Sequence, residues 1–452
     1  MQSNNIHTKQ LQDQNQQTID FILQNQNTNP KEAALKASNN PNVNVAFAVN
    51  QISGKQIAKT KLPMWYKNNQ VIYPSHISME QCSSQATAQY KARIANRLIK
   101  NNNIDKCKTT LIDLTGGFGV DCAIMSQEFC KAICVETQEE LSAISQHNMT
   151  VMRLNNVQCV NSTSVEVLEK VDYATIIYID PARRDKSGAR TYAIKDCTPN
   201  VLELKPRMLQ VAKFVIIKLS PMLDWRKAVC DFCGNVSQVH IVSHNNECKE
   251  LLLVLDSNMH SNIEVYCANN DSVTVFNAKY NPDLNKVEEV QETQESQESQ
   301  ESQESQESQE SHLQNEQNSN DSNDSISDWK NCAKYIYEPN SSIMKSGFFK
   351  ILSSKYNVFQ IASNSHVFIS CEYKSDFPGN IWKINNICSL NKKEISKALS
   401  KITYANIATY NFPLSVNDLK KRLKLKDGGN TRIIATTDSK NNHVLICASK
   451  AE

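Results

Sequence analysis

The stretch LIDLTGGFGVD, residues 111 to 121, joins a short apolar run to a glycine-rich turn that ends in an acid. Gly116, Gly117 and Gly119 would let the backbone turn tightly and approach a ligand, because glycine has no Cβ. Asp113, at the end of the apolar run, could accept hydrogen bonds from a ligand amine. A simple tight turn would use the same glycines, so the sequence around the stretch must distinguish a ligand cradle from a plain turn.

Short apolar runs alternate with helical patterns from Thr109 to Asp256. They predict seven strands: TLIDL, KAICVE, VQCV, ATIIYID, KFVIIKLS, VHIVS and LLLVLD. Strands separated by helices indicate an α/β, Rossmann-like core with a parallel sheet and right-handed crossovers. The last two runs are too close together for a long helix between them, which predicts an antiparallel hairpin at one edge of the sheet.

The second predicted strand ends in Glu136, where an acid can accept hydrogen bonds from both ribose hydroxyls of a nucleoside cofactor. The glycine turn lacks the G-x-G-x-x-G spacing that seats a pyrophosphate at a helix N-terminus, which argues against NAD. An Asp two residues ahead of T-G-G is similar to motif I of class I methyltransferases. The motif therefore predicts S-adenosyl-L-methionine as the cofactor.

The stretch IYIDPARRD, residues 177 to 185, ends the fourth predicted strand, which we expect beside the first. Asp180 and Pro181 would then face the reactive sulfonium of the cofactor, where the substrate must lie. The position resembles the acid-or-amide, Pro, Pro, aromatic motif of class I enzymes that methylate bases. Ala182 replaces the second proline and Arg183 the aromatic, so Asp180 keeps the acceptor role while the stacking group is missing.

Two arginines follow this motif and have two interpretations. Arg183 and Arg184 could stack through the guanidinium plane or clamp a phosphate, or they could form salt bridges with Asp185 or Asp196. The stretch KLSPMLDW, residues 218 to 225, ends the fifth strand at the same edge. We therefore expect its Ser and Pro to line the substrate side together with the arginines.

The stretch YPSHISMEQCSSQATAQYKA, residues 73 to 92, places polar groups just before a predicted helix. Ser83, Ser84 and Gln85 could cover the cofactor or cap the helix, and the sequence slightly favours capping.

Together, DLTGGFGVD, IDPARRD, KLSPMLDW and SMEQCSSQATAQYKA resemble a bacterial group of class I methyltransferases that carry a ferredoxin-like domain and a C-terminal THUMP-like domain. YEPNSSIMKSGFF is similar to the ferredoxin-like unit, and YNFPLSVNDLKKRLKLKDGGNTRIIATT to the THUMP-like module. The resemblance extends from about residue 60 to the end of the chain. THUMP domains imply structured RNA, tRNA or rRNA, as the partner.

The resemblance implies cofactor roles for Asp113, Gly116, Gly117, Gly119 and Glu136 and a substrate-facing role for Asp180, and the motifs themselves suggest the other residues of the predicted site. Ser162, in VNSTS, lies where many relatives use an Asp to hold the adenine amine. The cofactor-binding residues would be Asp113, Thr115, Gly116, Gly117, Gly119, Asp121, Glu136 and Ser162. The catalytic residues would be Asp180, Pro181 and Arg183, and the substrate-binding residues Arg184, Ser220 and Pro221.

Four regions follow from these patterns. We predict an N-terminal helical cap over residues 1–100, the class I methyltransferase core over 101–258, and two small α+β domains, ferredoxin-like over 259–376 and THUMP-like over 377–452. Six tandem Q-E-S triplets lie within 286–327, a segment whose composition predicts a disordered insertion. Residues 288 to 324 hold twelve acids and no Lys or Arg. Since the whole chain carries +2, the remainder carries +14, which favours a polyanionic partner.

The first residues lack the order of a signal peptide, and no apolar run approaches the roughly 18 residues of a membrane span, so we expect a cytoplasmic protein. The fifteen cysteines are scattered and form a single C-x-x-C, Cys230 with Cys233. We therefore expect structural thiols and no metal site. The oligomeric state is left open.

The most favoured function is an S-adenosyl-L-methionine-dependent methyltransferase that transfers methyl to a base of RNA. Two alternatives stay open: an RNA-binding protein that keeps the cofactor fold without turnover, and a methyltransferase of protein or small-molecule substrates. The first alternative is supported by the altered D-P-A-R motif, which lacks the stacking residue of base methyltransferases. The basic remainder and the THUMP-like tail count against the second.

Overall fold

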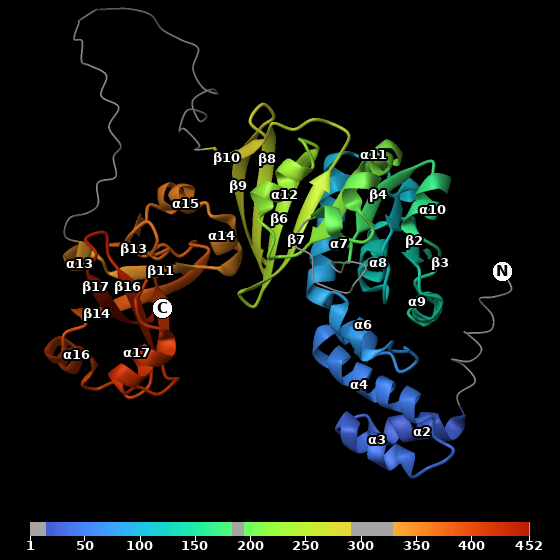
Figure 1. The fold of residues 1–452 in the computed structure, drawn as a ribbon, viewed down its shortest axis with the longest axis horizontal. Helices are drawn as coiled ribbons and strands as arrows, with labels where there is room; N and C mark the ends of the chain where they lie inside the picture. Colours follow the sequence, from blue (N-terminus) through green and yellow to red (C-terminus); the bar gives the residue numbers. More distant parts are fainter. Residues whose placement is uncertain (1–14, 183–193, 291–328, 452) are drawn as a thin grey trace, which may run out of the picture. The chain divides into compact units, whose positions relative to one another are not determined.

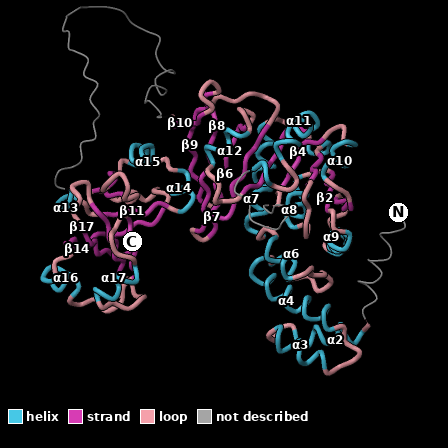
Figure 2. The backbone as a smooth tube through the Cα atoms, in the orientation of Figure 1, coloured by secondary structure: helices cyan, strands magenta, loops and turns pink. Residues whose placement is uncertain are grey.

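The computed structural model describes residues 15–182, 194–290 and 329–451. The chain divides into two compact units, Met1–Glu288 and Glu289–Glu452, and Figures 1 and 2 show their elements. The described part of the chain contains no helix long and apolar enough to cross a membrane. Of the predicted acidic insertion, the first residues form strand β10 (Lys286–Glu289), and residues 291–328 lie outside the described residues.

The first unit is built on a ten-stranded sheet in the order β10-β9-β8-β6-β7-β5-β4-β1-β2-β3. All seven predicted strands are present. They are β1 (Thr110–Asp113), β2 (Lys131–Glu136), β3 (Val157–Asn161), β4 (Ala174–Ile179), β5 (Ala212–Leu219), β6 (Val236–His244) and β7 (Glu247–Leu255). Strands β1 to β5 are parallel, and β4 lies beside β1 as expected. Their carboxyl ends therefore meet at one edge.

The predicted hairpin of β6 and β7 is present, but it does not form the edge of the sheet. Strand β8 (Asn262–Asn269) pairs in parallel with β6, and β9 (Ser272–Asn281) pairs antiparallel with β8. The two strands that the sequence assigned to the start of the ferredoxin-like domain thus pair with the first sheet. The unpaired backbone groups of β6 accept a further strand, and alternate residues of β8, such as Ile263 and Val265, are buried.

Helices cover both faces of this sheet. On one face, α7 (Gln85–Asn101), α8 (Val120–Met125) and α9 (Glu139–Val151) share a core with Leu111, Ile176 and Ile216. The next residues along the strands, Ile112 and Ile177, point to the other face and are also fully buried. Further helices complete the unit: α10 (Ser164–Lys170), α11 (Val201–Val211), which packs on β5, and α12 (Trp225–Asp231).

The expected N-terminal helical region precedes the sheet. Its helices are α2 (Gln16–Asn25), α3 (Pro30–Ser38), α4 (Val45–Lys61), α5 (Pro63–Tyr66) and α6 (His76–Gln81). Helices α2, α3 and α4 each begin after an Asn whose side chain accepts a backbone N–H of the first turn, as N-caps do. The Asn148 side chain of α9 hydrogen-bonds both the N–H and the C=O of Ile72, which ties this region to the sheet unit.

The second unit contains one seven-stranded sheet in the order β12-β13-β11-β14-β17-β16-β15. Its first part holds α13 (Trp329–Cys332), β11 (Tyr335–Pro339), α14 (Ser341–Ser346), α15 (Phe349–Tyr356), β12 (Phe359–Gln360) and β13 (Phe368–Ser370). Its second part holds β14 (Gly379–Ser389), α16 (Lys392–Leu399), β15 (Asn406–Tyr410), α17 (Val416–Leu423), β16 (Thr431–Thr437) and β17 (His443–Lys450). Because β14 pairs with β11, the two parts share a single sheet.

Candidate active site

The glycine turn presses against strand β2. Gly116 N–H donates to the Val135 carbonyl at 2.7 Å, and a Cβ at Gly116 would lie 2.3 Å from Cys134 Sγ. Gly119 begins α8 at φ +78°, in the left-handed region that favours glycine. Gly117 also has a positive φ, +53°, but a Cβ there would meet no atom within 4 Å. The turn is therefore close-packed below and open at Gly117, as a ligand cradle requires.

Glu136 holds the turn from the neighbouring strand end. Its Oε2 accepts the Gly117 N–H at 2.9 Å, and its Oε1 accepts the Gln138 N–H at 2.7 Å. Oε1 also accepts the Thr137 hydroxyl at 3.3 Å, whereas Oε2 keeps a further lone pair for a ligand hydroxyl. Ser162 lies next to this strand end, since its N–H donates to the Glu136 carbonyl at 3.2 Å. However, the Ser162 hydroxyl donates to Glu166 at 2.6 Å, beside the capping box of α10, so its contact with adenine stays a prediction.

Asp113 lies in the core and not at the open side of the turn. Only 1% of the residue is exposed; its Oδ1 accepts the Thr115 N–H at 3.0 Å, and its Oδ2 has no partner. Burial raises the pKa of this carboxyl well above its ordinary value. The predicted contact with a ligand amine has no support in this arrangement, because the carboxyl is enclosed in the core.

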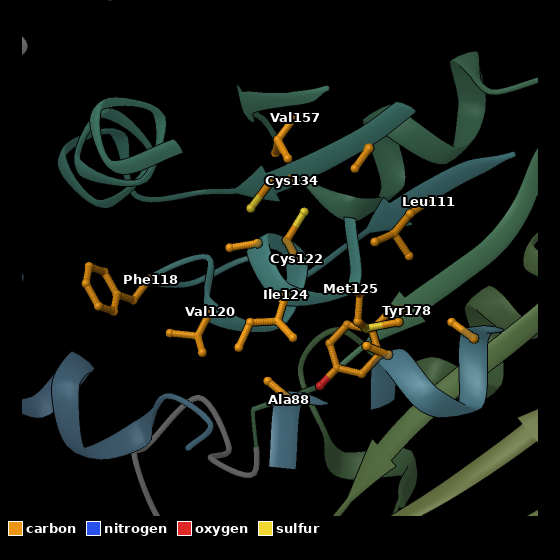
Figure 3. Close-up of a cluster of buried hydrophobic side chains, with 14 of the residues drawn as sticks. Ala88, Leu111, Phe118, Val120, Cys122, Ile124, Met125, Cys134, Val157 and Tyr178 are labelled. Atoms are coloured by element: carbon orange, nitrogen blue, oxygen red, sulfur yellow. The ribbon is translucent and has the colours of Figure 1, made fainter. Parts of the chain in front are cut away.

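Two buried thiols lie beside Asp113. Cys122 and Cys134 point toward one another in Figure 3, and the ligand atoms of all three side chains lie within 4.8 Å of one another. The hydrogen bond with Cys122, together with burial, raises the pKa of Cys134 well above its ordinary value. Metal binding needs thiolates, so we interpret this group as neutral core packing beneath the glycine turn.

The two motifs that the sequence singled out meet at the ends of β1 and β4. Asp180 N–H donates to Thr115 Oγ1 at 2.7 Å, and Leu114 N–H donates to the Tyr178 carbonyl at 2.9 Å. Pro181 is buried, whereas a third of the Asp180 side chain is exposed (34%). The structure thus places the Asp180 carboxylate at the same edge as the glycine turn. Arg183 and Arg184 lie outside the described residues.

A lysine that the sequence interpretation passed over occupies this edge. Lys218 Nζ donates to Asp180 Oδ2 at 2.5 Å, and 15% of the lysine side chain is exposed. Burial alone would lower the pKa of Lys218, but the charges of Asp180, Glu250 and Asp121 outweigh it and raise the pKa above the ordinary value. The predicted Ser220 and Pro221 follow two and three residues later, with Ser220 buried.

Behind this pair lies a set of buried polar groups, which we call the charge cluster: Lys91, Asp121, Glu250, Ser83 and Tyr178. Lys91 Nζ, fully buried, lies 2.8 Å from Asp121 Oδ1, 2.9 Å from Glu250 Oε2 and 2.8 Å from Ser83 Oγ. Ser83 Oγ and Tyr178 OH both donate to Asp121 Oδ2, at 2.7 and 2.8 Å. Burial opposes ionisation of Asp121, but Lys91 and Lys218 together hold its pKa below the ordinary value.

The charge cluster revises two predictions. Asp121 was predicted to bind the cofactor, but its two oxygens are taken up by protein donors within the core, which leaves the cofactor contact unsupported. Of the residues before α7, only Ser84 caps the helix, by accepting the Thr87 N–H. Gln85 accepts the Met64 N–H, and Ser83 belongs to the charge cluster. These two residues therefore neither cap the helix nor have a contact that supports covering the cofactor.

Three site residues that the sequence interpretation did not single out, Lys218, Glu250 and Lys91, are charged residues at positions where the pattern predicts an apolar side chain. Lys218 is a charge one residue before the end of an apolar strand, and Glu250 interrupts the approach to another, LLLVLD. Lys91 lies at a buried position of an amphipathic helix. Charges at positions that a core should fill are rarely neutral to stability, and they mark functional groups or their supports.

Comparison with known proteins supports the expected architecture. Two family models match: a ferredoxin-like domain over residues 335–378 and a THUMP domain-like module over residues 379–450. No curated protein matches the sequence significantly. A candidate methyltransferase from Porphyromonas gingivalis W83, known from a crystal structure, is 25% identical, with a TM-score of 0.73 over 96% of this chain and 98% of the other.

A crystal structure of an rRNA methylase from Streptococcus thermophilus is similar over a smaller part. It is 12% identical, with a TM-score of 0.28 over 37% of this chain and 93% of the other. The expected resemblance is confirmed by the family models and by the Porphyromonas structure. The chain combines a class I methyltransferase fold with a ferredoxin-like and a THUMP-like domain.

Proposed function

We propose that this protein is an S-adenosyl-L-methionine-dependent methyltransferase that acts on RNA. The observation that carries the proposal is the joint placement of three groups at one edge of the sheet. The open Gly117 donates to Glu136 at 2.9 Å, and Thr115 of the same turn accepts the Asp180 N–H at 2.7 Å. A cofactor seated on the first two groups therefore has its reactive end beside Asp180.

The residues present fit this cofactor. Gly117 leaves room for a ligand at the turn, Gly116 and Gly119 let the turn pack closely on the core, and Glu136 presents a carboxylate for the ribose hydroxyls. When bound, S-adenosyl-L-methionine supplies an electrophilic methyl group. The chain's own part is to orient the nucleophile in line with that methyl and to take up its proton, which are positioning and acid–base tasks.

The THUMP-like module supports RNA as the substrate. Residues 379–450 contain thirteen Lys or Arg and four Asp or Glu, a net charge of +9. Eight of these basic side chains are exposed on and around helices α16 and α17: Lys392, Lys393, Lys397, Lys401, Lys421, Arg422, Lys424 and Lys426. Such a concentration of exposed cations favours a phosphate backbone, since neutralising phosphates releases counterions.

Activity is tested by incubating the purified protein with methyl-labelled S-adenosyl-L-methionine and total RNA, with total cell protein as a parallel substrate. We expect label in RNA nucleosides alone. Label in protein alone would contradict the RNA assignment. Cofactor binding by calorimetry without any transfer would instead favour the non-catalytic RNA-binding alternative.

The RNA contact needs a test that keeps the second unit folded. Removing residues 380–452 would delete β14 and β17 from the sheet that also holds β11, so truncation within this unit is uninformative. The double variant Lys421→Glu/Arg422→Glu changes only exposed residues. If both contact phosphates, the slope of log affinity against log salt falls by about two. The matched control in the same unit is Lys350→Glu/Lys355→Glu, and equal slopes for the two variants would refute the contact.

A further inference from the structure

Asp180 and Lys218 form a pair fixed by the sheet itself. Ile179 of β4 is in register with Ile217 of β5, so the next residue of each strand emerges at the same level. The two side chains meet at 2.5 Å between Lys218 Nζ and Asp180 Oδ2. Both strands are held by backbone pairing on either side. The pair is therefore a built feature of the edge and not a chance surface contact.

The charge cluster acts electrostatically on Lys218. Asp121 and Glu250 both act electrostatically on Lys218, and both are fixed by the fully buried Lys91. The cluster is closed to solvent, whereas Lys218 is 15% and Asp180 34% exposed at the side chain. Of these charged groups, only Asp180 and Lys218 are exposed enough to reach a substrate. A substrate at the edge thus meets a carboxylate and an ammonium together.

This pair discriminates between nucleophiles. An exocyclic amine becomes positively charged as it attacks a methyl group, so a neighbouring ammonium opposes the reaction. A hydroxyl loses its proton as it attacks and its oxygen becomes more negative. An ammonium beside that oxygen and a carboxylate within reach of the proton therefore favour a hydroxyl.

The sequence around the pair agrees with this preference. The motif continues as D-P-A-R and lacks the aromatic residue on which a base would stack. Ala182 is bound through both its N–H and C=O to Thr198, so the backbone after Asp180 is occupied by protein partners. Among the described residues, nothing in this segment offers the flat apolar face that base recognition uses.

We propose that the nucleophile is a ribose hydroxyl of RNA, with Lys218 and Asp180 as the catalytic pair; this rests on the proposed methyltransferase function. The hydroxyl oxygen forms the bond to the methyl carbon while the carbon–sulfur bond breaks and its electron pair stays on sulfur. The hydroxyl proton passes to the Asp180 carboxylate and from there to water. Lys218 stabilises the oxygen as its negative charge develops. The substrate atom differs from the base position that the sequence predicted.

The product of the wild-type reaction tests the substrate atom directly. RNA labelled with methyl groups is hydrolysed in alkali, which cannot cleave next to a 2′-O-methylated ribose. We expect the label in alkali-resistant dinucleotides. Label in mononucleotides would identify a methylated base and overturn the inference, while the proposed function would stand. No label in RNA despite cofactor binding would overturn both.

Variants test the pair. Lys218→Met should lower the single-turnover rate by about 10²- to 10⁴-fold, while the dissociation constants for cofactor and RNA change less than threefold. Lys218→Arg keeps the cation and should recover part of the rate, which a purely packing role would not predict. Lys213→Met is the matched control, because Lys213 is exposed at the other end of the same strand. Equal rates for Lys218→Met and Lys213→Met would refute the assignment.

Discussion

Replacing Lys91 by methionine tests how strongly the charge cluster holds the first unit together. Methionine keeps the length and apolar body of lysine but removes Nζ. The substitution deletes contacts of 2.8 Å to Asp121, 2.9 Å to Glu250 and 2.8 Å to Ser83. It leaves two carboxylates, with side chains 10% and 5% exposed, without their buried cation.

The expected cost follows from this geometry. Removing one partner of a buried ion pair costs about 3–5 kcal/mol, because the remaining charge is left without compensation. Lys218 and the hydroxyls of Ser83 and Tyr178 stay near Asp121, so we expect the lower half of that range, about 3–4 kcal/mol. Since each 1.4 kcal/mol is a factor of ten, the unfolded fraction should rise about a hundredfold or more.

The assay is urea denaturation read by hydrogen–deuterium exchange of peptides from β1 and α8, which reports the first unit alone. The triple variant Lys91→Met/Asp121→Asn/Glu250→Gln removes the orphaned charges as well and should recover at least half of the loss. A change below about 1 kcal/mol for Lys91→Met, or a triple variant no more stable than the single one, would refute the reasoning.

Three further changes have definite expectations. Glu136→Gln should weaken S-adenosyl-L-methionine binding about 10- to 100-fold by calorimetry, because charge-assisted hydrogen bonds to the ribose are lost; the exposed Glu140→Gln should bind as the wild type does. Burial and Arg97 lower the pKa of His240 to about 3. An unfolded His takes up its proton from about pH 6.5 downward and the folded one does not, so stability is lost from there down to about pH 3, by about 2 kcal/mol at pH 5. His240→Gln should flatten that dependence in urea titrations at several pH values, and an unchanged slope would contradict the assignment. Glu338→Gln should destabilise the second unit by about 3 kcal/mol, since it removes the charge of a 3%-exposed carboxylate and replaces one of the two oxygens that accept from Arg432 with an NH2 donor; a loss under 1 kcal/mol would count against it.

The sequence predicted the methyltransferase core because its central strands are continuous apolar runs that are easily recognised. Runs such as ATIIYID and KFVIIKLS are buried on both faces, as central parallel strands must be, and their order follows from the handedness of the crossovers. The limits appear at the edge of the sheet. Whether NIEVYCAN joins the first sheet or opens a new domain depends on which backbone edge is free, and local pattern does not encode that.

For the site, the sequence identified residues by motif but could not assign their directions. Glu136, Gly117 and Asp180 come together as expected, since strand ends of a parallel sheet share one edge. From the sequence, Asp113 and Asp121 are equally plausible cofactor-binding acids, yet both side chains are buried in the core. A strand end or a first helical turn can present a side chain to either side, and for Asp121 the contact with Lys91 of α7 fixes the inward direction.

The charge cluster buries ionised groups whose desolvation costs free energy. Replacing buried ion pairs by apolar side chains is often neutral or stabilising, so stability alone gives little reason to keep Lys91, Asp121 and Glu250. Their position explains them better. They lie behind Lys218, which contacts Asp180, and they act on the charge of that lysine. If the cluster serves to orient Lys218, the triple variant should fold yet transfer methyl groups at least tenfold more slowly, with cofactor affinity retained. A variant that is both stable and fully active would reduce the cluster to packing and leave the Asp180–Lys218 pair to act without support.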